Sequence, residues 1–364
     1  MPILIDAHQD IAYNALTFKR DICASAFEIR RQEAGTMIPT WNEGEATVGW
    51  PEFQAGKVAV IFTTIWSPPL KYVDGAWDTL NFSNNQQASK LARQQFEYYH
   101  RLVEEHPDKF SLILTRADLE RVLARWQAPE NDPSPRPVGL MIHMEGAEGL
   151  RSMDELQEFY ELGLRQVGPV WAGMRYCGGS KETRPFDNEG YALLDTIARL
   201  GMAMDISHMS ESAALTALER FEGPVLASHS NARTPLKGRG GERHMTDQTI
   251  KLLFERDGCV GVVPYNKFLS PTWELTSPVG TVTINQMIEQ VDYYCQIAGD
   301  STHVGIGSDL DGAFGYPNIP LEFDTIQDFQ KMAPALQDRG YNSSDIENIF
   351  WLNWKRHLEK TLPK

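Results

Sequence analysis

Short apolar runs alternate with amphipathic segments along most of the chain. The runs have the length of strands and lie at residues 3–6, 58–66, 110–114, 138–143, 164–170, 203–207, 224–228, 259–264 and 304–308. Several of the intervening segments carry apolar residues at helical spacing. Capping boxes are predicted at three helix starts, formed by Ser152 with Glu155, Thr283 with Gln286, and Ser344 with Glu347. Alternating strands and helices predict parallel strands joined by crossover helices.

Two architectures fit this alternation, an open doubly wound sheet and a closed (β/α)8 barrel. A Gly-rich phosphate-binding turn after the first strand would favour the open sheet, but His8, Gln9 and Asp10 follow it here. Polar residues recur at the carboxyl ends of several runs, where barrel enzymes keep their active sites. We therefore predict an α/β fold, a single (β/α)8 TIM barrel domain over residues 1–364 with a C-terminal helix. The run 110–114 is the one extra strand, because no polar site residue follows it, and the proline-rich stretch 128–137 is a surface loop.

Composition narrows the range of partners. The 364 residues are 42% hydrophobic and carry a formal net charge of −15, which argues against nucleic acid and anionic membrane surfaces. The four cysteines are not closely paired, so no disulfide framework is predicted. The start has no signal-peptide pattern and no apolar run could span a bilayer. We expect a cytoplasmic protein with a small-molecule substrate and no nucleic-acid or membrane partner; a homodimer is one assembly open to it.

Five polar residues near strand ends form a candidate metal site. His8 and Asp10 are two apart after the first run, so their side chains point the same way. Glu145, His208 and His229 end or follow three further runs. A single histidine here is more often structural, and a single aspartate more often caps a helix, but the combination favours a metal site. Imidazoles with carboxylates suit zinc. Five ligands exceed what one open tetrahedral zinc needs, so we expect two Zn²⁺ per chain, other divalent metals being the alternative.

The remaining histidines are not assigned to this site. His143 shares the face of Glu145 and is expected to be a buried, hydrogen-bonded core residue. His100, His106 and His357 lie on helical patterns and are expected at the surface.

The motifs DAHQD, MEGAEG, DISHMS, ASHSNAR and GIGSDLDG, in this order along nearly the whole chain, resemble those of the membrane (renal) dipeptidase family of the amidohydrolase superfamily. The resemblance implies a (β/α)8 barrel with a binuclear zinc centre. It implies the following ligand set: His8 and Asp10 on one zinc, His208 and His229 on the other, and Glu145 bridging them. It also implies that Asp309 takes a proton from the attacking water and passes it to the leaving amine.

On the substrate side the resemblance is less complete. It implies that Arg243 grips the substrate's carboxylate, which the planar guanidinium suits; a solvated loop arginine is the alternative, and His244 replaces the asparagine that the family has next. Trp171 stands where the family has a histidine that helps polarise the scissile carbonyl, and its indole N–H can donate one hydrogen bond. Arg175 or Tyr176 could supply the missing donor, or both could simply pack or pair on the rim.

These features together predict a metal-dependent hydrolase that cleaves a small amide, a dipeptide with a free carboxyl end. Two alternatives stay open. One is an amidohydrolase acting on a non-peptide amide, an ester or a lactone, which Trp171 favours. The other is a metal-binding accessory protein without peptidase activity, against which the full set of ligands argues.

Overall fold

The structure is a computed structural model that describes residues 1–73, 75–129 and 131–364. Residue 130, in the predicted surface loop 128–137, lies outside the described residues. The parallel strands are β1 (Leu4–Gln9), β2 (Val58–Ile65), β3 (Phe110–Leu112), β4 (Val138–Glu145), β5 (Leu164–Gly168), β6 (Ala203–Asp205), β7 (Val225–Ala227), β8 (Cys259–Val262) and β9 (Val304–Ile306). Each of them falls within or over one predicted apolar run.

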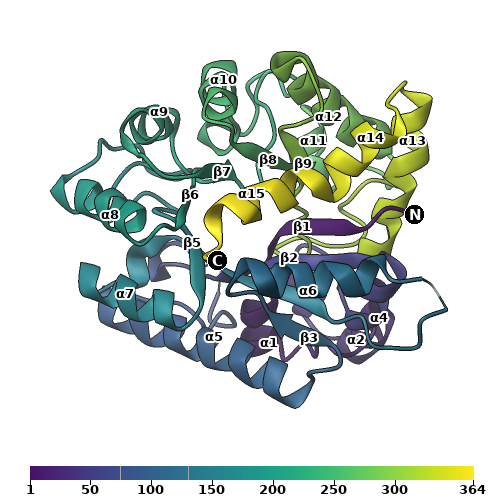
Figure 1. Cartoon of the computed structure of the whole chain (residues 1–364), viewed down its shortest axis with the longest axis horizontal. Coiled ribbons are helices and arrows are strands. Elements are labelled where there is room, and N and C mark those ends of the chain that lie inside the picture. Colours follow the sequence, from purple (N-terminus) through teal and green to yellow (C-terminus); the bar gives the residue numbers. More distant parts are fainter. Residues whose placement is uncertain (74, 130) are drawn as a thin grey trace.

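The strands form a closed barrel with one strand added outside it (Figure 1). The hydrogen-bonded order is β2-β1-β9-β8-β7-β6-β5-β4-β3, and β2 also pairs with β4, which closes the ring. Strand β3 pairs with Val138 to Leu140 at the start of β4, and β5 takes over the same edge of β4 from Ile142. Because β5 occupies that edge within the barrel, β3 is left outside. The (β/α)8 barrel with its extra strand at 110–114 is thus confirmed.

Helices surround the barrel and cover one of its ends (Figure 1). The α-helices are α1 (Ile11–Phe18), α2 (Ala26–Glu33), α3 (Ile38–Trp41), α4 (Trp50–Ala55), α5 (Asn85–Glu105), α6 (Arg116–Gln127), α7 (Met153–Glu161), α8 (Asn188–Arg199), α9 (Glu211–Arg220), α10 (Asp247–Glu255), α11 (Asn266–Leu269), α12 (Ile284–Ala298), α13 (Met332–Asp338), α14 (Ser343–Glu347) and α15 (Asn353–Thr361). The 3₁₀ turns are η1 (Leu70–Tyr72), η2 (Ala147–Gly149), η3 (Gly241–Arg243) and η4 (Ile326–Lys331), and η5 (Asn348–Leu352) is a π-helical turn.

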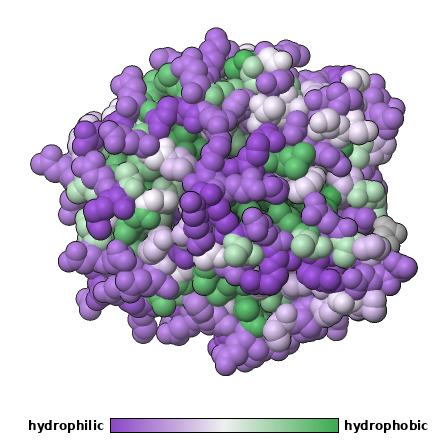
Figure 2. Space-filling view, in the orientation of Figure 1, coloured by the Kyte–Doolittle hydropathy of each residue, from purple (hydrophilic) through white to green (hydrophobic). Residues whose placement is uncertain are grey.

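The C-terminal helix α15 closes the end of the barrel at which the strands begin. Asn353 donates its side-chain N–H groups to the carbonyls of Ser301 and Val304, 2.7 and 2.6 Å away. The fully buried Trp354 donates to the Ile306 carbonyl at 3.0 Å. In Figure 1 this helix crosses in front of the strands. Hydrophilic side chains dominate this covered face, with hydrophobic ones scattered among them (Figure 2). The opposite end, where the strands finish, is the end at which barrel enzymes keep their active sites.

The predicted helix starts are only partly correct. Gln286 accepts from the backbone N–H and hydroxyl of Thr283, as the capping box predicts. The box at Ser152 and Glu155 is wrong, because Glu155 instead accepts from the Ser89 hydroxyl on α5 and from the Arg151 backbone N–H in the preceding loop. The box at Ser344 and Glu347 is also wrong. The helix starts two residues earlier, where Asn342 and Asp345 cap each other.

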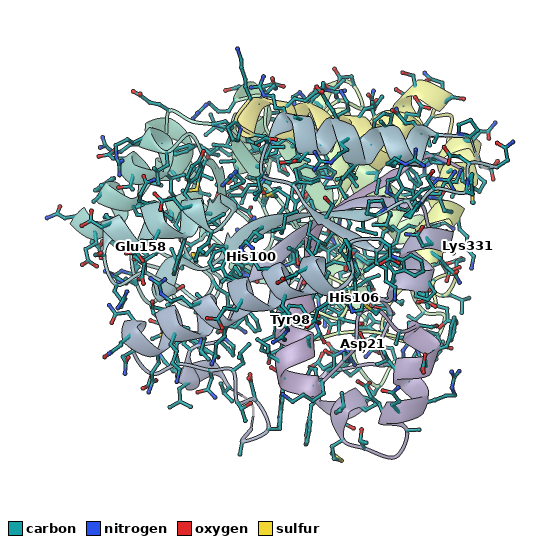
Figure 3. The ribbon with its side chains drawn as sticks, turned by 60° about the horizontal axis from the view of Figure 1, so that its bottom comes forward. Asp21, Tyr98, His100, His106, Glu158 and Lys331 are labelled. Atoms are coloured by element: carbon teal, nitrogen blue, oxygen red, sulfur yellow. The ribbon has the colours of Figure 1, made fainter. Side chains whose placement is uncertain are left out.

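Three histidines outside the site have different surroundings. His100 is exposed on α5, and His106 follows the end of that helix, both on the outer layer (Figure 3). The expectation that His357 lies at the surface is wrong, because it is buried on α15 and its Nε2 lies 3.0 Å from the side-chain amide of Gln166 in β5.

No helix in the described parts of the chain is long and apolar enough to cross a membrane. The cytoplasmic location and the homodimer stay predictions.

Replacing Trp354 with alanine should lower the free energy of unfolding by about 3 to 5 kcal/mol, because the change leaves a cavity against Phe62 and Gly305 and an unpaired carbonyl at Ile306. Urea unfolding of the purified protein measures this. The control is Val279→Ala, at a side chain that is 63% exposed, which should change stability by less than about 0.5 kcal/mol. A small loss at Trp354 would show that α15 is not part of the barrel core.

Candidate metal centre

The predicted site residues come from the carboxyl ends of different strands. His8 lies in β1 and Glu145 is the last residue of β4. His208, His229 and Asp309 follow β6, β7 and β9 within three residues. Parallel strands in a closed barrel all end at one rim, so these side chains converge there.

Glu145 stands at the centre of the group. Its Oε1 lies 2.7 Å from His208 Nε2 and 3.3 Å from His229 Nε2, and these two nitrogens are 2.9 Å apart. Its Oε2 lies 3.6 Å from His8 Nε2. One carboxylate therefore faces three imidazoles with both of its oxygens.

His8 connects Glu145 with two further carboxylates. Its Nε2 lies 3.9 Å from Asp10 Oδ1 and 3.8 Å from Asp309 Oδ1. The same Nε2 is buried and has no hydrogen-bond partner among the described residues. Two overlapping groups, each with ligand atoms within 4.8 Å of one another, could hold a metal ion: His8 with Glu145 and His229, and His8 with Asp10 and Asp309.

Burial and charge set the protonation of the group. Burial lowers the pKa of His8, but the carboxylates of Glu145, Asp10 and Asp309 raise it to about 10. Burial, with the charge of Arg243, lowers the pKa of His208 to about 4. Burial raises the pKa of Asp10 to about 6, with Glu145 adding to the rise. The carboxylates of Glu145, Asp10 and Asp309 thus stabilise positive charge at the His8 imidazole.

This donor set fits divalent cations. An unpaired buried imidazole nitrogen, two imidazole nitrogens directed at one carboxylate oxygen, and two further carboxylates are the hard and borderline donors that zinc and similar ions take. Asp10 precedes α1 but makes no side-chain cap to it, and its carboxylate instead accepts from the Thr64 hydroxyl. Its side chain is therefore turned toward the group and not toward the helix.

The turn that carries Asp309 has an unusual backbone. Asp309 has a φ of 53°, in the left-handed region that side-chain-bearing residues rarely adopt. A Cβ on Gly312 would lie 2.1 Å from Asp309 Oδ1 and 3.0 Å from Asp10 Oδ2. The turn thus needs a glycine at position 312 to let the two carboxylates lie so close together.

Two buried aspartates that the sequence did not reveal, Asp205 and Asp6, accept hydrogen bonds from residues next to the site. Asp205, at the end of β6, accepts from the hydroxyls of Ser207 and Ser228 at 2.7 and 2.5 Å. The Ser228 oxygen in turn lies 2.8 Å from His229 Nδ1. In β1, Asp6 accepts from the Ser308 N–H and hydroxyl at 2.7 and 2.5 Å. Each aspartate therefore fixes the serine that precedes a site residue on the neighbouring strand.

Asp205 also connects the site with the barrel interior. His143 Nε2 lies 3.2 Å from Asp205 Oδ2, and His143 Nδ1 lies 3.3 Å from the Gln166 side chain. Burial raises the pKa of Asp205, but His143 and the serine hydroxyls together hold it far below its usual value. His143 is buried, as predicted, and Asp205 keeps its charge. A polar residue inside an otherwise apolar strand was the signal that could have identified it.

An open cavity of about 350 Å³ lies over the group. Six of the predicted site residues line it: Asp10, Glu145, Trp171, His208, Arg243 and Asp309. His8 and His229 lie beneath it and are at most 1% exposed. The structure thus brings all of the predicted site residues to one place.

Arg243 lies on the 3₁₀ turn η3 at the cavity wall. Its Nη1 donates to the Ser207 carbonyl and the Ser230 hydroxyl, both at 3.3 Å, and its Nη2 donates to the His229 carbonyl at 2.9 Å. The guanidinium packs over the Phe268 ring, 5.1 Å from its centroid. These contacts use three of the five N–H donors. Arg243 is therefore held firmly and not solvated as a loose loop residue.

Trp171 lies in the loop after β5. Its ring centroid is 6.0 Å from that of His208 and 5.4 Å from that of Trp66. Arg175 pairs with Glu189 at 3.0 Å and donates to a backbone carbonyl, and Tyr176 is fully buried. Neither is among the described residues that line the cavity. The two are packed and paired, as the simpler alternative predicted.

The sequence gives little sign of two other cavity residues, Ser180 and Lys181. The Ser180 hydroxyl lies 3.2 Å from His208 Nδ1 and donates to the Trp171 carbonyl at 3.1 Å. Lys181 lines the cavity next to it. Both belong to an irregular loop, where neither strand nor helix periodicity predicts the direction of a side chain.

Replacing Asp205 with asparagine should lower the free energy of unfolding of the chelator-treated protein by about 2 to 4 kcal/mol, because a charged acceptor of several buried hydrogen bonds is lost. Asp205 has a depressed pKa in the folded state, so its stabilisation is present above the unfolded pKa of about 4 and is lost only as the pH falls below that value. Urea unfolding should give a constant difference between about pH 8 and about pH 5.

The control is Asp195→Asn on the exposed face of α8, where the side chain is 65% exposed and pairs with Arg220. It should change the free energy of unfolding by less than about 1 kcal/mol. A difference at Asp205 that already shrinks between about pH 8 and about pH 5 would contradict the charged state of this carboxylate.

Comparison with known proteins identifies the family. The family model of membrane dipeptidase (peptidase family M19) matches residues 1–362. A protein of Klebsiella pneumoniae described as lying in the pqqA 5′ region is 29% identical over 276 residues, 73% of this chain and 94% of that protein. Dipeptidase ataJ of Aspergillus terreus is 27% identical over 297 residues, 73% of this chain and 66% of that protein.

Solved structures share the fold. A metallopeptidase from Rhodobacter sphaeroides, liganded with a phosphinate mimic of the dipeptide L-Ala-D-Ala, has a TM-score of 0.76 at 22% identity, over 99% of this chain and 100% of that one. The probable dipeptidase PvdM from Pseudomonas aeruginosa has a TM-score of 0.78 at 15% identity, over 99% and 96%. At these identities the likeness concerns the fold. Since the family model matches nearly the whole chain, this protein belongs to the membrane dipeptidase family of metallodipeptidases and is a metal-dependent hydrolase.

Proposed function

We propose that this chain is a binuclear zinc dipeptidase that acts on dipeptides with a free carboxyl end, and that residues 1–364 work as one domain. The observation that carries the proposal is the arrangement around Glu145, where three imidazoles and two more carboxylates meet beneath a cavity that also contains Arg243. In this proposal His8 and Asp10 would hold one Zn²⁺, His208 and His229 would hold the other, and Glu145 would be shared between the two.

The bound ions would supply Lewis acidity for the scissile carbonyl and a water with a lowered pKa. The chain's own residues do the rest. Asp309 accepts the proton of the attacking water at its carboxylate and passes it to the leaving amine. Burial raises the pKa of Asp309 well above its usual value, and the neighbouring Asp10 and Glu145 add to this despite the opposing charge of His8. A carboxyl group with a raised pKa holds a proton more readily between these two steps.

Arg243 binds the substrate's carboxylate in this proposal. Two of its five N–H donors have no acceptor among the described residues, which suits a bidentate contact with a carboxylate. Its other donors hold the carbonyls of Ser207 and His229, so the carboxylate site is rigidly tied to the metal-binding loops. The distance between Arg243 and the metal ligands then limits the substrate to a short one.

Trp171 forms a wall of the cavity in this proposal. With Trp66 and Tyr72 it makes a set of aromatic rings whose centroids lie 5.4 and 6.1 Å from its own. Its indole N–H can donate to a substrate oxygen, whereas the ring excludes water from the carbonyl. The indole N–H would then be the donor that Trp171 offers to the substrate where the family has a histidine.

The variant Asp309→Asn should lower kcat for a zinc-loaded dipeptide assay by about 10²- to 10⁴-fold, because the proton carrier is lost. Elemental analysis should still find two Zn²⁺ per chain. The matched control is Asp338→Asn on the exposed end of α13, which should keep kcat. A variant that loses one equivalent of zinc would mean that Asp309 is a ligand and not the proton carrier.

The variant Arg243→Lys should lower kcat/KM for a dipeptide by about 10- to 100-fold, since one charged hydrogen bond of about 1.5 to 3 kcal/mol is lost. The same dipeptide with a C-terminal amide should lose much less, because it has no carboxylate to bind. Steady-state kinetics on both substrates measures the difference. Equal losses would assign Arg243 to holding the loops alone, and hydrolysis of a lactone or non-peptide amide without any dipeptide turnover would overturn the dipeptidase proposal.

A further inference from the structure

Lys181 is a cation at the cavity without an acidic partner. It lines the cavity, and among the described residues no carboxylate pairs with it. The acids near it in the chain are already engaged: Glu182 by Lys71 and Tyr72, and Asp187 by Arg184 at 2.8 Å. An unpaired ammonium facing a substrate cavity in a chain with a formal net charge of −15 is available for an anionic group of the ligand.

The loop that carries Lys181 is built to hold it in place. Its backbone N–H donates to the Ala172 carbonyl at 3.1 Å, and the flanking N–H of Glu182 donates to the same carbonyl at 2.8 Å. On the other side, the Ser180 N–H donates to the Trp171 carbonyl at 3.3 Å. The start of the side chain is therefore as fixed as the loop itself, and only the flexible stem can move.

Trp171 positions the ammonium beside the site. The Nζ of Lys181 lies over the indole ring, 5.9 Å from its centroid, within the range of a cation–π contact. The same ring is next to His208, 6.0 Å between centroids. Trp171, which stands where the family has a histidine, thus holds the Lys181 ammonium at the edge of the metal centre.

The barrel order tells which part of a dipeptide faces Lys181. The loops after β5, β6 and β7 are neighbours on the rim, because these strands pair in that order. His208 follows β6, Arg243 lies in the loop after β7, and Lys181 lies in the loop after β5. A dipeptide with its carboxylate on Arg243 and its amide over His208 would have its N-terminal residue on the side of the loop that carries Lys181.

We infer that Lys181 is a specificity-determining residue that binds the side-chain carboxylate of the N-terminal residue, so that the substrates are dipeptides beginning with aspartate or glutamate. This inference rests on the proposed dipeptidase function and goes one step further, to the class of substrate. Glu43, a carboxylate on the cavity wall, does not neutralise Lys181, because it accepts from the Tyr265 hydroxyl at 2.5 Å and makes no ion pair with Lys181 among the described residues.

The test compares kcat/KM of the zinc-loaded enzyme for Glu-Ala and Gln-Ala, which differ in charge but hardly in shape. The wild-type enzyme should prefer Glu-Ala by about tenfold, as expected for one charge-assisted contact at a partly solvated site. In Lys181→Met, which keeps the length of the stem, the preference should fall to about twofold or less. In Lys181→Glu it should reverse, with Lys-Ala preferred over Glu-Ala.

The matched control is Lys267→Met, which removes another lysine that lines the cavity, on α11. The preference for Glu-Ala should persist in this variant. Dissociation constants of Glu-Ala and Gln-Ala for the Asp309→Asn variant, measured by calorimetry, give a readout of recognition that does not depend on turnover. Turnover of dipeptides with no preference for Glu-Ala, or a preference that only Lys267→Met abolishes, overturns the assignment of Lys181 and leaves the dipeptidase proposal intact. If no dipeptide is cleaved and neither ligand binds, the proposed function fails and this inference fails with it.

Discussion

The crowding of carboxylates around one buried imidazole is the constraint on which this site depends. Glu145, Asp10 and Asp309 all lie within 3.9 Å of the Nε2 of His8. Bringing such charges out of water costs several kcal/mol each unless positive charge compensates them. A protonated His8 supplies one such charge, and a divalent ion bound to the neutral imidazole would supply positive charge in place of that proton. The rim of the barrel therefore favours cations, which agrees with the candidate ligand set and with the glycine at position 312 that lets two carboxylates lie close together.

Two similar hydrogen bonds, each from a serine hydroxyl to a buried aspartate, hold the site residues in place. Asp6 in β1 binds Ser308 beside β9, and Asp205 in β6 binds Ser228 beside β7. In each case the aspartate belongs to an otherwise apolar stretch of strand, and the serine directly precedes a site residue that follows the paired neighbour. Since a buried carboxylate is costly without its donors, slippage of either strand pair is penalised. The barrel register and the geometry of the site are thus fixed by the same hydrogen bonds.

The sequence predicts the fold and the position of the candidate ligands because both follow from local patterns. Apolar runs mark the strands, and a polar residue at the end of such a run must lie at the rim of a parallel barrel. The Asp205–Ser228 contact could not be predicted, because it depends on the register between two strands. His357 was misplaced, because a helix that closes a barrel has an apolar face and one histidine on it resembles a surface residue. Ser180 and Lys181 come from an irregular loop, whose path depends on contacts with Trp171 and not on periodicity.

Trp171 differs in its chemistry from the histidine that the family resemblance implies at this position of the cavity wall. An imidazole at this position can donate or accept a proton, whereas an indole only donates and presents a broad apolar face. That face joins Trp66 and Tyr72 in one aromatic wall beside His208. Charges next to an apolar wall are less screened than charges in water. Under the proposed function, an indole in place of an imidazole would leave one N–H donor on this side of the cavity and would strengthen the interactions of nearby cations with the substrate's charges.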